Sequence, residues 1–425
     1  MKKVLWILFV LLMTLLLVGG CILFLYEQVD KPSIRPADIL YVQAEDGPPH
    51  EVPLRDYAWY EPVLGGGLFK EFRKPAVEQL NIRFTTKSDR LSLSLDGIEG
   101  LELHVKLTGR SGVVFDGPAA ELTSFRFLAA GNYQAEVRAW RGASGSRAYG
   151  EYLYQFEIEV QLDTTAALSA QKTVQGEILR LTLEQVPEGV TPQGESELGP
   201  VNFIEKDGRF IAYIPVSYRQ GTGERTVTVR CGEFEEELKV WVEAGTFPTE
   251  YHHSAEGKTP APESDAAAKE YRDAIWPLFD TAAPEQYWSE AFLQPVTLPI
   301  TGRFGAYVYL DEAQQPARNP GIDIAGEKGL PVFAPNRGKV VFAGRLALTG
   351  GTVVIEHGGG VKSYFYYMDS ITVRQGDMVE RNAQVGTIGD DGTSEPPHLN
   401  YELKIGAQSV DPIRVFIGKS ALYLR

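Results

Sequence analysis

The chain opens with a long apolar run. It extends from residue 4 to about residue 26 without a charged side chain and follows two lysines. About 20 apolar residues are enough to span the roughly 30 Å hydrocarbon core of a bilayer. Lysines on the N-terminal side favour a cytoplasmic N-terminus, because basic residues stay on the cytoplasmic side of a membrane. The pattern predicts that residues 1–30 form a cytoplasmic stub and a single-pass signal anchor, in contact with the lipid bilayer through residues 4–26.

A second interpretation of this run concerns Cys21. The sequence Val18-Gly19-Gly20-Cys21 is similar to a bacterial lipobox, in which the cysteine is lipidated after cleavage. The residues after Cys21 remain apolar, however, whereas a mature lipoprotein is normally polar there. A cleaved signal peptide also has an apolar region of only about 7 to 15 residues. We favour the uncleaved anchor, with lipidation as the alternative; both leave the bulk of the chain outside the cell and tethered to a membrane.

Residues 31–78 are polar and contain several prolines, which predicts a juxtamembrane segment. An aromatic and glycine-rich stretch runs from residue 59 to residue 69 within it. Such a stretch either rests on lipid headgroups or forms the first packed piece of the next domain, and we favour the second interpretation.

Two stretches of alternating apolar and polar residues follow. Leu91, Leu93 and Leu95 show this two-residue period, which is typical of strands in an antiparallel β-sandwich. We therefore expect one β-sandwich module over 79–165 and an immunoglobulin-like one over 166–247. In the second module, Asp207-Gly208 separates two apolar stretches, and this pair tolerates the positive φ angles of a tight hairpin turn. Cys231 is expected to face the core of a strand.

Residues 248–295 have a different character. Residues 259–263 have the composition of a linker, and Ser264 is a suitable N-cap for a helix. Ala267, Tyr271, Ile275 and Leu278 then recur at about helical spacing. The pattern predicts a short helical connector without catalytic residues.

Composition narrows the range of functions. The chain has 41 Lys and Arg against 56 Asp and Glu, a formal net charge of −15. Nucleic acids attract clustered basic residues, so we expect no nucleic-acid partner. Two cysteines cannot build a disulfide scaffold or a four-thiolate zinc site. With only six histidines, histidine-based metal chemistry has few candidate residues.

The C-terminal part, residues 296–425, contains a series of short glycine-bearing motifs. They lie at residues 300–305, 319–325, 329–335, 338–344, 351–358, 373–379, 397–402 and 410–412. Their order and content resemble the domain of peptidase family M23, also called the LytM or lysostaphin type. The regions before this domain are similar to those of membrane-anchored Gram-positive relatives. The expected fold is mainly β: a transmembrane helix, two small antiparallel β-sandwich modules, a helical connector and an M23/LytM-like β-sheet domain.

The resemblance implies a specific site chemistry. Active members of the family hydrolyse peptide bonds in peptidoglycan. Their zinc is held by the histidine and aspartate of an H-x-x-x-D motif and by the second histidine of an H-x-H motif. The first histidine of H-x-H and a further histidine on a strand position the water and stabilise the oxyanion. Three protein ligands leave one zinc position open for that water.

This sequence departs from the family pattern at most of these positions. Asn319 stands at the first ligand position, with Asp323 kept four residues later, and Asn400 stands at the third. His398 is kept, and Tyr367 replaces the strand histidine. A neutral carboxamide is a poor zinc ligand compared with imidazole. We therefore expect no catalytic residues, no metal ligands and no cofactor, and a vestigial groove at these five residues that binds a peptide.

Three hypotheses follow for function. The favoured one is a catalytically degenerate, membrane-anchored protein of the bacterial cell envelope, which binds peptidoglycan or a protein partner in cell-wall remodelling, division or sporulation. The first alternative is an active M23 metalloendopeptidase that uses zinc with atypical ligands. The second alternative is an adhesin-like protein that binds through its β modules.

Overall fold

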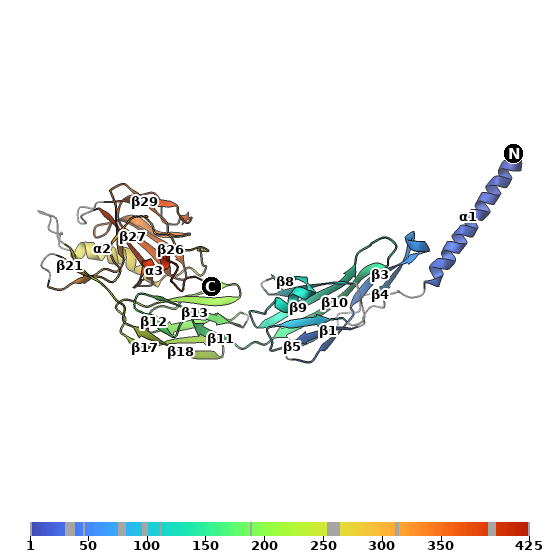
Figure 1. Ribbon diagram of the computed structural model, residues 1–425, viewed down its shortest axis with the longest axis horizontal. Helices are drawn as coiled ribbons and strands as arrows, with labels where there is room; N and C mark the ends of the chain where they lie inside the picture. The colour runs from blue at the N-terminus through green and yellow to red at the C-terminus, as the bar shows by residue number, and fades with distance from the viewer. Residues whose placement is uncertain are drawn as a thin grey trace. The chain divides into compact units, whose positions relative to one another are not determined.

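The computed structural model describes residues 2–29, 39–45, 47–74, 82–95, 101–110, 112–187, 189–252, 264–310, 314–389 and 397–423. The chain forms two compact units, Met1–Asp163 and Thr164–Arg425 (Figure 1). The predicted class is confirmed: the chain is mainly β, with an apolar helix at its start and a β-sheet domain at its end. The linker expected at 259–263 lies outside the described residues.

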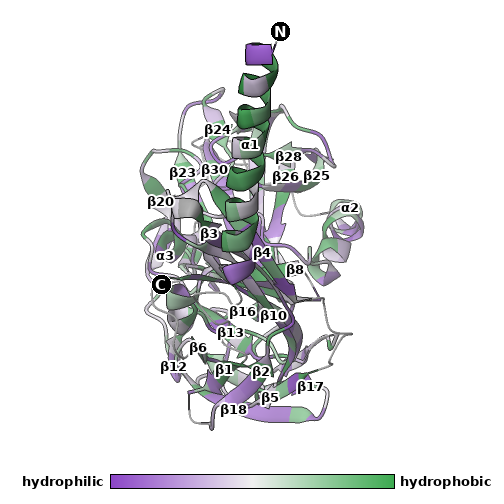
Figure 2. Ribbon diagram, turned by 90° about the vertical axis from the view of Figure 1, so that its right-hand side faces the viewer, coloured by the Kyte–Doolittle hydropathy of each residue, from purple (hydrophilic) through white to green (hydrophobic). Residues whose placement is uncertain are grey.

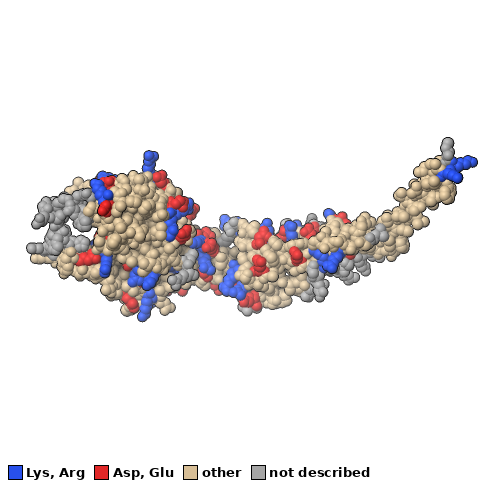
Figure 3. Space-filling model, turned by 45° about the horizontal axis from the view of Figure 1, so that its top comes forward, with Lys and Arg blue, Asp and Glu red and all other residues tan. Residues whose placement is uncertain are grey.

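Helix α1 (Lys2–Gln28) has 27 residues. At about 1.5 Å per residue its length of roughly 40 Å exceeds the apolar core of a bilayer. Its most apolar window has a mean hydropathy of 2.9, and within the described part of the chain no other helix is long and apolar enough to cross a membrane. Apolar residues cover most of its length (Figure 2), and basic residues lie at its N-terminal end (Figure 3).

The first unit contains a β-sandwich. One sheet has the strand order β2-β1-β6, and the other has the order β4-β3-β10-β9-β7-β8, with β5 paired to β10. Both sheets contribute to one core, in which Trp59 stacks on Tyr152 at a centroid distance of 5.2 Å. The strands are β1 (Ile39–Ala44), β2 (His50–Pro53), β3 (Asp56–Val63), β4 (Leu68–Lys74), β5 (Arg83–Thr86), β6 (Leu91–Ser94), β7 (Glu102–Gly109), β8 (Gly112–Pro118), β9 (Gly131–Arg141) and β10 (Tyr149–Val160); two 3₁₀ turns are η1 (Leu64–Gly66) and η2 (Ala119–Ser124).

The sandwich begins earlier than the sequence pattern indicated. Strands β1 to β4 come from the stretch 31–78, which we expected to be a separate juxtamembrane segment, and they pair with β6 and β10. The aromatic stretch is therefore the first packed piece of the domain, as the favoured interpretation of it proposed. The boundary was obscured because polar residues interrupt the alternation: Glu61 is buried in the core, where its carboxylate accepts a hydrogen bond from Nε1 of Trp59 at 2.8 Å.

The second unit starts with another sandwich of two four-stranded sheets, ordered β11-β13-β16-β15 and β12-β18-β17-β14. Asp207 and Gly208 form the two-residue turn between β15 and β16, both with positive φ, as the sequence predicted. Cys231 is buried and is not in a disulfide. The strands are β11 (Thr165–Leu168), β12 (Lys172–Val174), β13 (Ile178–Glu184), β14 (Gln193–Ser196), β15 (Phe203–Lys206), β16 (Arg209–Pro215), β17 (Gly223–Cys231) and β18 (Phe234–Glu243).

A short connector follows. It consists of β19 (Thr249–His252), α2 (Asp265–Ile275) and the 3₁₀ turn η3 (Trp276–Asp280). The Oγ of Ser264 accepts a hydrogen bond from the backbone N–H of Ala267, which caps α2 as expected. Strand β19 pairs with β21, so the connector is joined to the C-terminal domain.

The C-terminal domain is built on a ten-stranded sheet whose main path is β20-β23-β30-β27-β26-β25-β28. Strand β30 lies between β23 and β27, which places its residues at the middle of the sheet. The elements are β20 (Ile300–Gly302), β21 (Tyr307–Leu310), β22 (Ala317–Arg318), β23 (Ile322–Ala325), β24 (Pro331–Phe333), β25 (Gly338–Leu346), β26 (Gly350–Gly358), β27 (Val361–Ile371), β28 (Met378–Val379), β29 (Gln384–Ile388), β30 (His398–Ile405), β31 (Gln408–Val410) and α3 (Pro412–Phe416).

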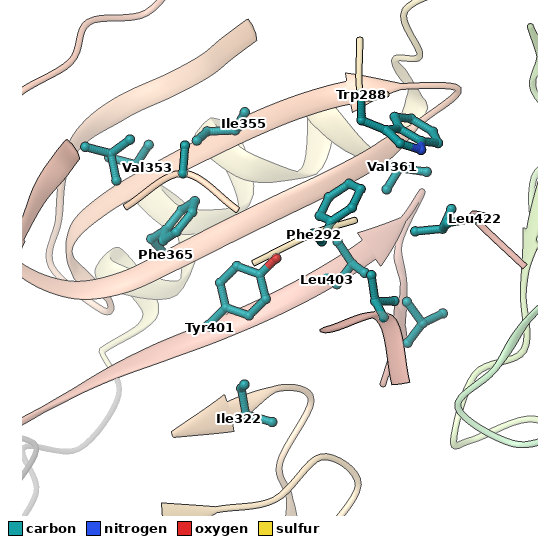
Figure 4. Packing of buried hydrophobic residues seen from close by; sticks show 14 of the residues in the cluster. Trp288, Phe292, Ile322, Val353, Ile355, Val361, Phe365, Tyr401, Leu403 and Leu422 are labelled. Atoms are coloured by element: carbon teal, nitrogen blue, oxygen red, sulfur yellow. The ribbon is translucent and has the colours of Figure 1, made fainter. Parts of the chain in front are cut away.

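One face of this sheet shares a core with the preceding sandwich. Trp288 and Phe292 pack there with residues of β26, β27 and β30 (Figure 4). Tyr213 of β16 joins the same core, and its ring lies 5.4 Å from that of Trp288. The sandwich and the sheet domain are therefore two parts of one packed unit.

His357 lies within this core and is fully buried. Its Nδ1 is 2.9 Å from the carbonyl oxygen of Arg337, and its Nε2 is 2.8 Å from Oγ of Ser363. Burial lowers the pKa of His357 to about 4, although the contact with the Arg337 carbonyl acts in the opposite direction. The imidazole is therefore neutral at physiological pH and serves the core.

The shared core predicts a large effect of truncating Trp288. Trp288 is 3% exposed, so Trp288→Ala is expected to lower the free energy of unfolding by about 3–5 kcal/mol. Trp276 is 54% exposed and provides a matched control, for which we expect a change within about 0.5 kcal/mol. Denaturant unfolding of the full chain in detergent, followed by near-ultraviolet circular dichroism, measures both. Equal effects of the two substitutions would contradict the shared core.

The buried His357 predicts a pH dependence of stability. The unfolded histidine takes up a proton near pH 6.5, whereas the folded one does so only near pH 4, so acidification favours the unfolded chain within this window. The free energy of unfolding should be about 2 kcal/mol smaller at pH 5 than at pH 7 through this residue alone. The variant His357→Gln should lose that part of the pH dependence. A variant with the same pH profile as the parent protein would exclude this role.

Candidate functional site

The candidate site is centred on Asp323, which projects from the middle strands of the C-terminal sheet. Asp323 on β23 pairs with Asn400 on β30, and Asn400 pairs in turn with Tyr366 on β27. On the other side, Asp323 is opposite Gly302 of β20. A Cβ atom at Gly302 would lie 1.9 Å from Oδ2 of Asp323, so the carboxylate occupies its position only because this residue is glycine.

Both oxygens of the Asp323 carboxylate accept hydrogen bonds from carboxamides. Nδ2 of Asn319 donates to Oδ2 at 2.9 Å, and Nδ2 of Asn400 donates to Oδ1 at 2.7 Å. Asn319 is buried, and its Oδ1 accepts a hydrogen bond from the backbone N–H of Gly321 at 3.0 Å. That second contact fixes which end of the Asn319 carboxamide faces the carboxylate, because the amide nitrogen cannot accept it.

His398 and Tyr367 complete the cluster. Nε2 of His398 lies 3.6 Å from Oδ1 of Asp323, and the two side chains are 18% and 20% exposed. The ring of Tyr367 meets the imidazole of His398 edge to face at a centroid distance of 5.3 Å. Tyr367 has a φ angle of 61°, a left-handed conformation that is uncommon for an aromatic residue. The structure therefore brings all five residues selected from the sequence together, from three strands and the loop between β22 and β23.

This cluster does not fit a catalytic zinc ion. Zinc is held by imidazole, thiolate or carboxylate groups, and a catalytic site needs three of them. At Asp323 the flanking side chains are carboxamides, and their N–H groups point at the carboxylate that would bind the metal. Within the described ranges, no three His, Cys, Asp or Glu side chains are grouped in a way that would hold a metal ion. His357 is no substitute, because it lies in the core on the opposite face of the sheet.

Sequence reasoning missed the residues that border the cluster on its own face of the sheet. The hydroxyl of Tyr366 is 3.0 Å from the hydroxyl of Tyr271 on α2, and Ile275 of α2 is fully buried against the same face. The connector helix therefore covers the sheet directly beside Asn400. Two sequence patterns indicate this contact only when they are combined. Alternate residues of β27 are tyrosines, and Tyr271 lies on the apolar stripe of the connector.

A buried ion pair lies further along this covered face. Lys404 contacts Glu402, and its Nζ is 5.5 Å from the ring centre of Tyr364. Burial alone would lower the pKa of Lys404, but the charge of Glu402 beside it raises that pKa above its ordinary value. Burial also raises the pKa of both Tyr364 and Tyr366 well above the usual range for a phenol. With these pKa shifts, Lys404 is charged and both phenols are neutral at neutral pH.

Comparison with known proteins identifies the same part of the chain. A model of peptidase family M23 matches residues 317–412. DD-carboxypeptidase/endopeptidase Mpg of Neisseria meningitidis serogroup B is 37% identical over 95 residues, which are 22% of this chain and 22% of that protein. Murein hydrolase activator NlpD of Escherichia coli K12 is 36% identical over 97 residues, 23% of this chain and 25% of that protein. The chain thus spans about a quarter or less of the length of these two relatives.

A third relative is matched over nearly its whole sequence. Lipoprotein NlpD of Yersinia enterocolitica is 36% identical over 93 residues, which are 22% of this chain and 95% of that sequence. The range that the family model matches, residues 317–412, includes all five members of the Asp323 cluster. Through this C-terminal domain, the chain belongs to peptidase family M23.

Proposed function

We propose that this chain is a cell-envelope protein whose M23-type domain binds peptidoglycan or a protein partner during cell-wall remodelling and does not hydrolyse peptide bonds. The observation that carries the proposal is the Asp323 carboxylate held by the carboxamides of Asn319 and Asn400. A site of this kind lacks the ligands that would bind zinc and lower the pKa of a zinc-bound water to about 7. Without such a water, the domain has no activated nucleophile for peptide hydrolysis.

The relatives do not decide between catalysis and binding. One of them is named as a carboxypeptidase and endopeptidase and another as an activator of murein hydrolases, and they are 37% and 36% identical to this chain. The chain is therefore about equally similar in sequence to a relative named as a peptidase and to one named as an activator. The choice rests on the residues at the ligand positions, and these favour binding.

The cluster offers groups suited to a peptide or an amide. Asp323 and His398 are each partly exposed, and Tyr367 adds a half-buried aromatic ring beside them. Carboxylate, imidazole and phenol groups form hydrogen bonds with backbone amides, and the ring contributes apolar contact. Peptidoglycan peptides and extended protein segments both present such amides.

Helix α1 would tether this domain to the membrane. Two lysines precede it, and its length and apolar surface match a bilayer span. The N-terminus would then be cytoplasmic, with both β-rich units outside the cytoplasm. Lipidation at Cys21 remains the alternative form of anchoring, and the similarity to Gram-positive anchored proteins remains a prediction from the sequence.

The proposed lack of a functional zinc site predicts a low zinc content, which can be measured. The full chain, purified in detergent, stripped with a chelator and dialysed against zinc, is expected to hold far less than one zinc per chain by elemental analysis. Asp323→Ala should leave that value unchanged, because Asp323 is not a ligand here. Zinc near one per chain that is lost in Asp323→Ala would support the alternative of an active peptidase with atypical ligands.

A gain-of-function variant provides the positive control. Asn319→His combined with Asn400→His supplies two imidazoles on either side of Asp323, a ligand set that zinc prefers. We expect this double variant to bind about one zinc per chain in the same assay. It should still hydrolyse purified cell walls poorly, because Tyr367 stands in place of the strand histidine that family resemblance assigns to the transition state.

Binding itself is testable with purified cell-wall sacculi. His398→Ala and Tyr367→Ala should each weaken co-sedimentation of the full chain by roughly fivefold, since one lost hydrogen bond is worth about 1 kcal/mol. Tyr251→Ala is the matched control, because Tyr251 is an exposed tyrosine outside the cluster in the same unit. Sacculus binding that none of these substitutions changes would instead favour binding through the β modules.

A further inference from the structure

One end of the first unit is formed by two turns that pack against each other. These are the β3–β4 turn and the β9–β10 turn, residues 64–67 and 142–148, which we call the two-turn end. A Cβ atom at Gly66 would lie 2.3 Å from Cβ of Ser146, so the two turns are in direct contact. Together they present one continuous surface.

The side chains at this end include three aromatic rings and an exposed leucine. The ring of Tyr149 stacks on that of Tyr60 at 4.8 Å and meets Phe69 edge to face at 5.1 Å. Leu68, the first residue of β4, is 38% exposed. Aromatic residues of this kind are enriched at the level of lipid headgroups, where an apolar ring meets a polar boundary.

Two basic residues belong to the same end of the unit. Arg147 is exposed in the β9–β10 turn. Lys70, the third residue of β4, is partly buried. Two basic residues at this end of a chain with a net charge of −15 are complementary to the phosphates of a lipid surface.

Lys70 also connects the two-turn end to the apolar helix. Its Nζ donates a hydrogen bond to the carbonyl oxygen of Tyr26 at 3.0 Å and lies 5.1 Å from the centre of the Tyr26 ring. Carbonyl groups in the last turn of a helix lack partners within the helix, and a lysine there supplies one. Tyr26 is near the outer end of the apolar run, so with α1 across a bilayer this contact would set the two-turn end at the level of the outer membrane boundary.

We infer that the two-turn end docks on phospholipid headgroups beside α1, with Leu68 among the lipids and Arg147 on their phosphates. This inference rests on the proposed membrane anchoring by α1 and adds a second lipid contact to it. The first sandwich is then held against the membrane, and is not a freely rotating domain on a tether.

The opposite end of the same sheet supplies a matched control. Strand β7 runs antiparallel to β9, so the β7–β8 turn lies at the far end from the two-turn end. Val113 beside that turn is an apolar residue with 53% exposure. It resembles Leu68 in chemistry and differs from it in its place on the sheet.

The test uses the full chain in vesicles of phosphatidylcholine and phosphatidylglycerol. Single cysteines replace Leu68, Arg147, Val113 or Leu16 in a Cys21→Ser background, and each carries an environment-sensitive fluorophore; Cys231 is buried and stays unlabelled. Leu16 lies in the middle of α1 and reports on membrane insertion. Lipids with spin labels at the headgroup or in the acyl chain act as quenchers. Circular dichroism checks that each labelled chain is folded.

We expect blue-shifted emission from the labels at positions 68 and 147, with several-fold stronger quenching by headgroup spin labels than at position 113. The label at position 16 should be quenched by acyl-chain spin labels. Labels at 68 and 147 that behave like the one at 113, while position 16 is in lipid, would overturn the docking and leave the anchor intact. A label at position 16 that is exposed to water would overturn both.

Discussion

The chemistry of the C-terminal domain follows from the way one carboxylate obtains its partners. Asp323 lies among strands β20, β23 and β30, where a charged group is stable only if a cation or several hydrogen-bond donors meet it. Here the donors are the carboxamides of Asn319 and Asn400, one on each oxygen. These neutral donors satisfy both oxygens of the carboxylate, and the sheet around it keeps the family fold.

The packing on both faces of the sheet gives the domain a core that does not involve the candidate site. Trp288 and Phe292 join the sheet domain to the preceding sandwich through a shared core. On the other face, α2 covers the tyrosines of β27 and the pair formed by Glu402 and Lys404. Apolar burial on both faces of the sheet supplies the stability, which leaves the ligand positions free to change.

Much of the fold and of the site was predictable because the signals are local. The Asp207-Gly208 turn and the Ser264 cap each depend on one or two residues, and the structure has both. The five residues of the cluster were found from their positions in the motifs that resemble those of family M23. Their assembly is a geometric result, while their role in binding is a proposal.

The remaining features depend on contacts between distant segments. The hydrogen bond between Tyr271 and Tyr366 joins residues 95 positions apart, and neither side chain has a pattern that names its partner. The same holds for Tyr213 and Trp288, which lie in modules that the sequence pattern separates. The start of the first sandwich was misplaced for a related reason: the buried Glu61 is satisfied by Trp59, and a charged residue in a strand pattern indicates a surface position.

Gly302 shows how a residue with no side chain controls the candidate site. Any larger residue there would collide with Oδ2 of Asp323 and displace the carboxylate from both carboxamides. In a genetic screen, substitutions of Gly302 would therefore impair function as strongly as substitutions of the five cluster residues, even though glycine has no side chain that could contact a ligand. The positions sensitive to mutation around this site would include residues that leave room for the Asp323 carboxylate as well as residues that contact a partner.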